Sequence, residues 1–201
     1  MQTGRGADRI KAVVIGASAG GLHALLRLFA RLPPDCAVPL VVALHRYPDA
    51  EEEGLEVFFR GRCPLPVHDA ADKDDIAAGQ IYFAPPDYHL LIESAASFAL
   101  SVDAKVNFAR PSVDVLFESA ARVWGAGLLG VVLTGANGDG AEGLRRIKEL
   151  GGMTVVQDPA TAEYPVMPRA ALATGAVDLV LCIEEIGELI GRLGSGAARD
   201  L

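Results

Sequence analysis

The chain has 201 residues, of which 51% are hydrophobic, and carries a formal net charge of −8. This length suits one α/β domain with a sizeable core and leaves no room for a second large domain. Because phosphate groups are bound by concentrated Lys and Arg side chains, the acidic balance argues against a nucleic-acid partner and against an anionic membrane surface.

Membrane, metal and cofactor classes are also disfavoured by the sequence. No apolar run approaches the roughly 20 residues that span a bilayer, and the N-terminus lacks the apolar core of a secretory signal. The three cysteines are odd in number and widely spaced, which indicates neither a disulfide framework nor a zinc site. We therefore expect a cytoplasmic protein without membrane insertion, metal or cofactor.

The first patterned stretch lies at residues 12–32. An apolar run predicts a strand over 12–15, and leucines at helical spacing predict a helix over 21–32 that Pro33 ends. The connecting loop departs from the dinucleotide fingerprint G-x-G-x-x-G, because Ser18 replaces the glycine that must approach pyrophosphate. It fits the nucleophile elbow G-x-S-x-G from Gly16 to Gly20, and a capping role for Ser18 is an equal alternative.

Strands and helices alternate through the rest of the chain. Further strands are predicted at 40–44, 80–84, 89–92, 98–102, 128–133, 154–157 and 179–182. Further helices are predicted at 49–61, 111–124 and 141–150, with a short one ending at 173 and a last one ending near 193. This alternation predicts a doubly wound, mostly parallel sheet with helices on both faces, and a small antiparallel hairpin at 89–102. The domain is expected at 10–194, between tails at 1–9 and 195–201.

Three chemically active side chains follow three predicted parallel strands. Ser18, His45 and Asp139 each come directly after an apolar run, and the carboxyl ends of parallel strands meet at one edge, where ligands bind. A hydroxyl, an imidazole and a carboxylate are the groups of an acyl-transfer triad. A nucleotide-binding sheet would carry an acid where His45 stands, and the order Ser, His, Asp excludes the usual α/β-hydrolase.

Each of these residues has a structural alternative. His45 alone suits an interface or a cap, and Asp139 with Glu142 fits the helix-capping pattern D-x-x-E. Asp158 is a rival carboxylate at the end of the next strand. The rival bases are His23, His68 and His89. The catalytic interpretation is favoured by the coincidence of three suitable groups at three strand ends.

With these residues in place, the chain resembles the catalytic domain of the bacterial chemotaxis protein-glutamate methylesterases over residues 12–193. The matching motifs are I-G-A-S-A-G-G at the elbow, L-H-R-Y-P around His45, I-Y-F-A-P-P-D-Y-H in the middle, R-P-S-V-D-V-L-F from Arg110, L-T-G-A-N-G-D-G-A-E-G around Asp139, and Q-D-P-A-T with M-P-R-A-A from Gln157. The resemblance implies a serine esterase that hydrolyses γ-glutamyl methyl esters on chemoreceptors to glutamate and methanol, with glutamine deamidation as a possible second activity.

The resemblance assigns the nucleophile to Ser18, the general base to His45 and the orienting acid to Asp139, and we expect the Ser18 hydroxyl to hydrogen-bond His45. The residues expected around the oxyanion are Ala19, Gly20, Gly135, Ala136 and Asn137. The residues expected on the substrate side are Arg46, Arg110, Met167 and Arg169. The implied partners are the cytoplasmic helices of methylated chemoreceptors, and because these helices are acidic, local cations rather than the net charge of the chain would attract them.

Several positions depart from the family pattern. The family commonly has T-G-M-G before the acid, where this chain has Ala136 and Asn137. It usually has Thr at Ala19, and Phe-Gly where this chain has Pro165-Val166. These changes keep open a catalytically weak, methylesterase-like binding or regulatory module. A flavodoxin-like nucleotide-binding protein is a third alternative. Family members usually also carry a receiver domain, and we expect none here, because the N-terminal tail at 1–9 is too short to form one.

Overall fold

A seven-stranded parallel sheet forms the centre of the molecule in the computed structural model, which describes residues 10–46 and 54–195. The strands are β1 (Ala12–Ala17), β2 (Leu40–Leu44), β3 (Val67–Asp69), β4 (Ile81–Phe83), β7 (Leu128–Val132), β8 (Met153–Gln157) and β9 (Leu179–Leu181). Their spatial order is β3-β4-β2-β1-β7-β8-β9, and every neighbouring pair is parallel.

The central strand β1 positions the functional edge of the sheet. All six of its residues are buried, as expected for a continuous apolar run covered on both faces. From β1 the chain adds strands first toward β2 and later toward β7, so the direction of winding reverses between β1 and β7. A reversal of this kind leaves a crevice at the carboxyl ends of the two strands, which is where open α/β sheets bind their ligands.

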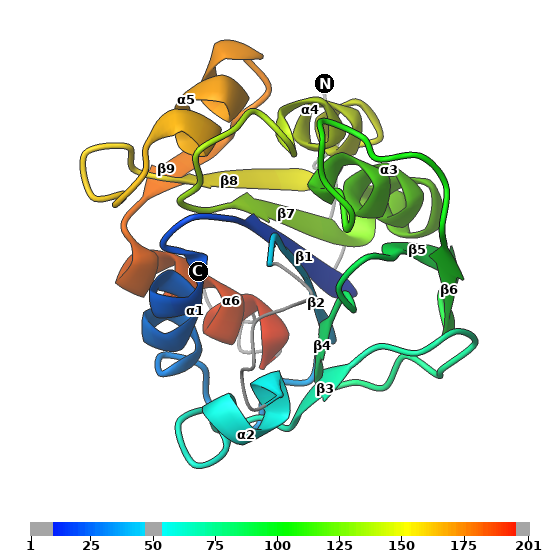
Figure 1. Ribbon diagram of the computed structural model, residues 1–201. Coiled ribbons are helices and arrows are strands. Elements are labelled where there is room, and N and C mark those ends of the chain that lie inside the picture. The colour runs from blue at the N-terminus through cyan, green and yellow to red at the C-terminus, as the bar shows by residue number, and fades with distance from the viewer. Residues whose placement is uncertain (1–9, 47–53, 196–201) are drawn as a thin grey trace, which may run out of the picture.

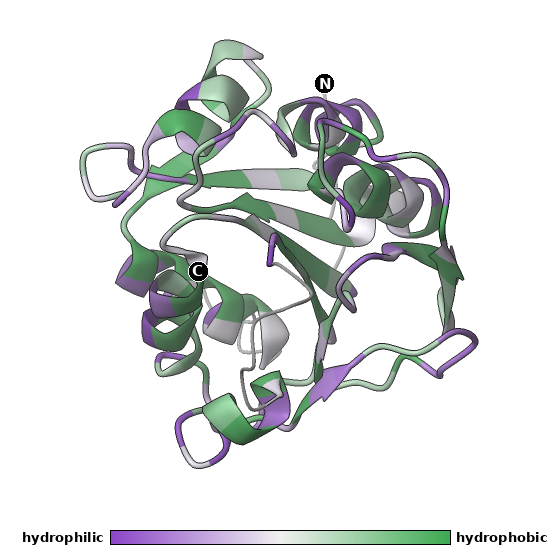
Figure 2. Ribbon diagram, in the orientation of Figure 1, coloured by the Kyte–Doolittle hydropathy of each residue, from purple (hydrophilic) through white to green (hydrophobic). Residues whose placement is uncertain are grey.

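Helices cover both faces of the sheet (Figure 1). One face packs against α1 (Gly21–Phe29), α2 (Leu55–Phe59) and α6 (Ile183–Gly194), and the other against α3 (Val113–Trp124), α4 (Ala141–Glu149) and α5 (Val166–Ala173). Figure 2 shows the apolar colour concentrated on the strands and on the inward sides of these helices. The two faces therefore bury two separate apolar clusters, one on each side of β1.

The predicted hairpin is present as β5 (His89–Ser94) and β6 (Ser97–Ser101), which pair antiparallel outside the main sheet. It is attached to α3 by a hydrogen bond from the backbone N–H of Ile92 to the hydroxyl of Ser119, 3.0 Å long. A single 3₁₀ turn (Gly125–Gly127) joins α3 to β7. The predicted fold class is confirmed, and the main sheet is parallel throughout.

Some local predictions differ from the structure. The strand β3 was missed, because its sequence V-H-D has one apolar residue, whereas the equally short β4 and β9 are continuous apolar runs. The helix predicted over 49–61 is shorter: α2 ends at Phe59, just before Gly61 turns with φ of 72°, and its predicted start at 49–53 lies outside the described residues. The predicted tail at 1–9 and all but the first residue of the predicted tail at 195–201 also lie outside them. In the parts that are described, no helix combines the length and apolarity needed to cross a membrane.

Candidate active site

Ser18 occupies a tight turn between β1 and α1. Its N–H donates to the carbonyl of Thr134 at 3.0 Å, and its own carbonyl accepts from the N–H of Gly21 at 2.8 Å. The N-cap of α1 is Gly20, which has φ of 74° and receives no side-chain capping bond. The capping alternative for Ser18 is therefore wrong, and no described residue hydrogen-bonds its hydroxyl.

Close packing around Ser18 depends on Gly135, in the loop after β7. A Cβ atom at Gly135 would lie 1.9 Å from the Met167 sulfur and 3.0 Å from Cβ of Ser18. Met167 itself is 1% exposed. Only glycine therefore lets this loop lie against Ser18, and Met167 contributes by packing beneath the loop.

His45 follows β2 and is held beside the end of β1, where its N–H donates to the carbonyl of Ala17 at 3.0 Å. Its ring Nε2 lies 2.8 Å from Oδ2 of Asp139, whose side chain is fully buried. Ser18 and His45 both line a cavity of about 530 Å³. The loops after β1, β2 and β7 thus bring the three predicted residues to one place, with the carboxylate behind the imidazole.

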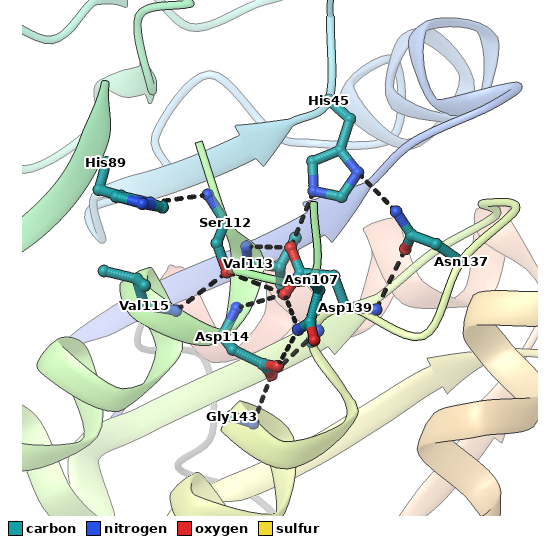
Figure 3. A network of polar contacts seen from close by, with 11 residues as sticks. His45, His89, Asn107, Ser112, Val113, Asp114, Val115, Asn137, Asp139 and Gly143 are labelled. Carbon is teal, nitrogen blue, oxygen red and sulfur yellow. Dashed lines mark hydrogen bonds and ion pairs between the residues drawn. The ribbon is translucent and has the colours of Figure 1, made fainter. Parts of the chain in front are cut away.

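The Asp139 carboxylate sits at the N-terminus of α3 (Figure 3). It accepts hydrogen bonds from the hydroxyl of Ser112 at 2.9 Å, and from the backbone N–H groups of Val113 at 2.6 Å and Asp114 at 3.2 Å. The side-chain amide of Asn107 donates a further bond at 2.9 Å. Burial by itself raises the pKa of Asp139, but the bonds from His45, Asn107 and Val113 outweigh it and hold the pKa below its ordinary value. This acid stays ionised at neutral pH.

Asp114, in the first turn of α3, bonds the N-terminus of α4. Its Oδ1 accepts from the N–H groups of Gly140 at 3.0 Å and Gly143 at 2.7 Å. Burial, reinforced by the nearby Asp139 carboxylate, raises the pKa of Asp114 to about 6. Asp139, which precedes α4, therefore caps α3, and Asp114 of α3 caps α4. The alternative in which Asp139 caps its own helix is wrong, because the N-cap of α4 is Gly140 without a side-chain bond.

Asn137 determines which ring nitrogen of His45 carries the proton. Its Oδ1 accepts from the N–H of Asp139 at 3.1 Å, and a backbone N–H can only donate, so the amide nitrogen must face His45. That nitrogen lies 3.1 Å from Nδ1 of His45 and can only donate to it. Nδ1 is therefore the unprotonated nitrogen, and Nε2–H donates to Asp139.

Ser18 and His45 are both described, but the expected hydrogen bond between the serine hydroxyl and the imidazole is absent. Nε2 is occupied by Asp139 and Nδ1 by the Asn137 amide, so neither nitrogen is left for the serine. Asn137 stands where the family commonly has glycine, and the amide contact is thus a consequence of one of the departures seen in the sequence.

Comparison with known proteins identifies the family to which the chain belongs. The sequence model of the CheB methylesterase family matches residues 13–190. The crystal structure of the Thermotoga maritima CheB methylesterase catalytic domain aligns with a TM-score of 0.86 at 32% identity, covering 92% of this chain and 98% of that one. The chain belongs to the CheB methylesterase family.

Two relatives illustrate the match. A Leptospira interrogans protein, provisionally named a protein-glutamate methylesterase/protein-glutamine glutaminase, is 46% identical over 91% of this chain and 94% of its own length. The protein-glutamate methylesterase/protein-glutamine glutaminase 2 of Anaeromyxobacter dehalogenans is 43% identical over 93% of this chain but only 54% of its own length. The prediction of a methylesterase of this family is confirmed, and the alternative of a nucleotide-binding protein is wrong.

The loops predicted to surround the oxyanion contribute unequally. The N–H of Gly135 donates to the carbonyl of Tyr164 at 2.9 Å and is not free. The N–H groups of Ala19 and Ala136 have no partner among the described residues, and both residues line the cavity. Gly20 does not line it, and its role is to turn the chain with a positive φ. Ala19 and Ala136 are therefore the better candidate donors.

The three predicted arginines occupy different positions. Arg46 lines the cavity and bonds Asp69 at 2.6 Å, while its buried Nε has no partner in the part of the chain that is described. Arg110 also lines the cavity, but its guanidinium is held by Asp87 and by two backbone carbonyls. Arg169 is exposed on α5 and does not line the cavity.

The rival residues lie outside the cavity. His89 is 2% exposed, with Nε2 on the carbonyl of Ala104 at 3.1 Å and Nδ1 accepting from the N–H of Ser112 at 3.2 Å. It therefore supports the start of α3, behind Asp139. His68 bonds Gln80, His23 is exposed on α1, and Asp158 caps a local turn.

Sequence reasoning missed the supporting residues Asn107, Ser112 and Asp114. The motif R-P-S-V-D-V-L-F carries two of them and was recognised only as a pattern. The pair of polar residues at a helix start was the available signal, since such residues commonly cap helices. Their contact with a carboxylate from a distant loop is tertiary and could not be read from spacing.

Proposed function

We propose that this chain is a serine esterase that hydrolyses glutamyl methyl esters on chemoreceptor helices to glutamate and methanol, and deamidates glutamine side chains at such sites. One observation carries the proposal: Ser18 and His45 open on the same cavity, and His45 is bonded to a buried carboxylate. The names of the relatives support the choice of protein glutamate and glutamine as substrates.

In the proposed reaction the Ser18 oxygen attacks the ester carbonyl while Nδ1 of His45 takes the hydroxyl proton. The imidazolium then protonates the departing methoxide, which leaves as methanol, and an acyl-enzyme remains. Water attacks this ester with the same proton transfers and releases glutamate. Asp139 stabilises the imidazolium through Nε2. Compared with the serine-protease arrangement, in which the acid bonds Nδ1, the two ring nitrogens exchange roles.

The negative oxygen of the tetrahedral intermediate needs hydrogen-bond donors at the cavity wall. We assign this role to the backbone N–H groups of Ala19 and Ala136, which have no hydrogen-bond partner among the described residues. A well-placed donor of this kind contributes about 3 kcal/mol to transition-state stabilisation. Because both contribute through the backbone, the departures from Thr at 19 and Met at 136 leave this function intact.

The substrate side of the cavity carries cations that suit an acidic helix. Arg46, Lys105 and Arg110 line it, against the carboxylate of Asp87. Arg46 is paired with Asp69 and Arg110 with Asp87, so we propose that Lys105 is the main cation that attracts the acidic cytoplasmic helices of methylated receptors locally, despite the net negative charge of the chain. We also propose that the enzyme acts in the cytoplasm. We assign the catalytic unit to residues 10–194, since the elements from β1 to α6 build a single sheet with its covering helices.

A catalytically weak binding module is the second candidate. The contact of Asn137 with Nδ1 of His45 favours it, because that contact occupies the nitrogen which must accept the serine proton. Labelling of Ser18 by a fluorophosphonate would argue against this candidate. Receptor binding without labelling or turnover would support it.

The decisive test is methanol release from methyl-labelled receptor membranes. We expect release by the wild-type chain and its loss, by at least a thousandfold, in Ser18→Ala. Ser94→Ala is the matched control, because Ser94 is exposed on the hairpin and does not line the cavity. Activity that survives Ser18→Ala would overturn the assignment of the nucleophile.

A further inference from the structure

A short turn before α3 projects at the mouth of the cavity. The N–H of Val106 donates to the carbonyl of Ala109 at 3.2 Å, and the reverse bond is 2.9 Å, which closes a two-residue loop. The residues of the loop are Asn107 and Phe108, with φ of 51° and 62°. Two successive left-handed residues are typical of a type I′ turn. Asn is favoured at the first position and Gly at the second, so the phenylalanine is the unusual choice.

Phe108 is 99% exposed, although it is one of the largest apolar side chains in the protein. A bulky residue in the left-handed region also strains the backbone, at a cost of about 1 kcal/mol. Neither the exposure nor the strain contributes to folding. Residues held in such conformations concentrate at functional sites, which favours a contact between the Phe108 ring and a bound partner.

The turn is held rigidly against the catalytic groups. The side-chain amide of Asn107 donates to Asp114 at 2.7 Å and to Asp139 at 2.9 Å (Figure 3). On the other side, Arg110 bonds the carbonyl of Val102 at 2.7 Å and Asp87 at 2.8 Å. The carboxylate that holds His45 therefore also fixes the base of the turn. A surface held this way loses little conformational entropy when a partner binds.

The length of the glutamyl ester side chain limits how far the substrate main chain can lie from Ser18. Three carbon–carbon bonds separate the Cα atom of a glutamyl ester from its carbonyl carbon, a span of about 4 Å. The attacking oxygen lies about 3 Å beyond that carbon in a reactive arrangement. The substrate main chain can therefore be only about 7 Å from the Ser18 hydroxyl. It must lie across the rim of the cavity, to which Lys105 and Phe108 contribute.

We propose that Phe108 is the docking contact for the substrate helix. Its ring packs on the apolar side chains that flank the methylated glutamate. Lys105, which forms no ion pair with any described residue, meets the acidic residues of the same helix. This inference rests on the proposed function for the identity of the occupant, and it adds a surface outside the reacting groups that selects a protein substrate over a small ester.

The test uses Phe108→Gly, because Asn-Gly is the preferred sequence of a type I′ turn, so the variant removes the ring while favouring the backbone. Phe108→Tyr is the matched control that keeps an aromatic ring. Binding of a methylated receptor cytoplasmic fragment is measured on a Ser18→Ala background, where turnover cannot interfere. Methanol release and the rate of Ser18 labelling by a small fluorophosphonate are measured with Ser18 present.

We expect Phe108→Gly to weaken fragment binding about tenfold and to raise KM similarly, with kcat and Ser18 labelling within twofold of wild type. Phe108→Tyr should bind like wild type. Unchanged binding and KM in Phe108→Gly would overturn the docking role while leaving the proposed function intact. A loss of Ser18 labelling in parallel with the loss of binding would also overturn it, because it would place Phe108 in the chemistry. Binding that depends on Phe108, in a chain that releases no methanol, would support docking and overturn the proposed function.

Discussion

Replacing Asn137 with glycine should make Ser18 more reactive. The Asn137 amide donates to Nδ1 of His45 at 3.1 Å, and this nitrogen must accept the Ser18 proton when the serine attacks. The two donors compete for one lone pair. Asn137→Gly removes one competitor and restores the residue that the family commonly has at this position.

The size of the effect follows from a single hydrogen bond. A neutral hydrogen bond of this geometry contributes about 1 kcal/mol net, because its loss is partly compensated by water. At 25 °C this free energy corresponds to about a fivefold change in the population of the free imidazole nitrogen. We therefore predict about a fivefold increase in the second-order rate of Ser18 labelling by a fluorophosphonate, and a similar increase in kcat for methanol release.

Two further variants separate competition from loop structure. Asn137→Asp keeps an oxygen for the N–H of Asp139 but cannot donate to Nδ1, and its carboxylate favours the protonated ring, so labelling should slow. Gly138→Ala is the matched control, since its methyl group would meet only Cβ of Ala170, at 3.8 Å, and should leave the rate unchanged. Thermal unfolding of each variant verifies that the loop still folds.

The reasoning would be refuted by a folded Asn137→Gly protein that labels at the wild-type rate or more slowly. Such a result would mean that Asn137 orients the imidazole productively, or that the contact is already broken when the reagent binds. Faster labelling in both Asn137→Gly and Gly138→Ala would instead point to loop mobility as the cause.

Two other predictions concern stability. Burial raises the pKa of Asp114 to about 6, above the ordinary 3.8, so the folded state binds this proton more tightly than the unfolded state. Lowering the pH from 7.5 to 5 should therefore stabilise wild type by about 1 kcal/mol relative to Asp114→Asn. Urea unfolding of both proteins at the two pH values measures this, and a difference that is independent of pH would contradict it. Gly135→Ala should lose at least 2 kcal/mol, because its Cβ would overlap the Met167 sulfur, and Met167→Ala should recover part of the loss. Simple additivity of the two substitutions in denaturant melts would show that they do not share a contact.

The fold was predictable because its strands are buried on both faces. Continuous apolar runs at β1, β2 and β7 have no other stable environment in a chain of this size, and the short connections leave few topologies. The residues after those runs were then predictable as neighbours, which is why Ser18 and His45 were found together. β3 was not predicted because its sequence V-H-D contains a single apolar residue and so lacks the continuous apolar run that marks the other strands of the sheet.

The details of the site were not predictable, because they depend on tertiary hydrogen bonds. Asp139 followed by Glu142 has the local signature of a cap for α4, yet its carboxylate bonds the start of α3 instead. Similarly, Arg110 has the charge to bind a substrate, but its guanidinium is largely used by carbonyls and Asp87. Spacing in the sequence records neither choice, since both partners come from other elements.

The exchange of carboxylates between α3 and α4 affects how loss-of-function alleles should be read. Asp139 and Asp114 each cap a helix from another part of the chain, so the acid that bonds His45 also stabilises the fold. A knockout made at Asp139 would confound lost chemistry with lost folding. A genetic experiment that needs an inert but intact protein should therefore alter Ser18, whose side chain caps none of the described helices.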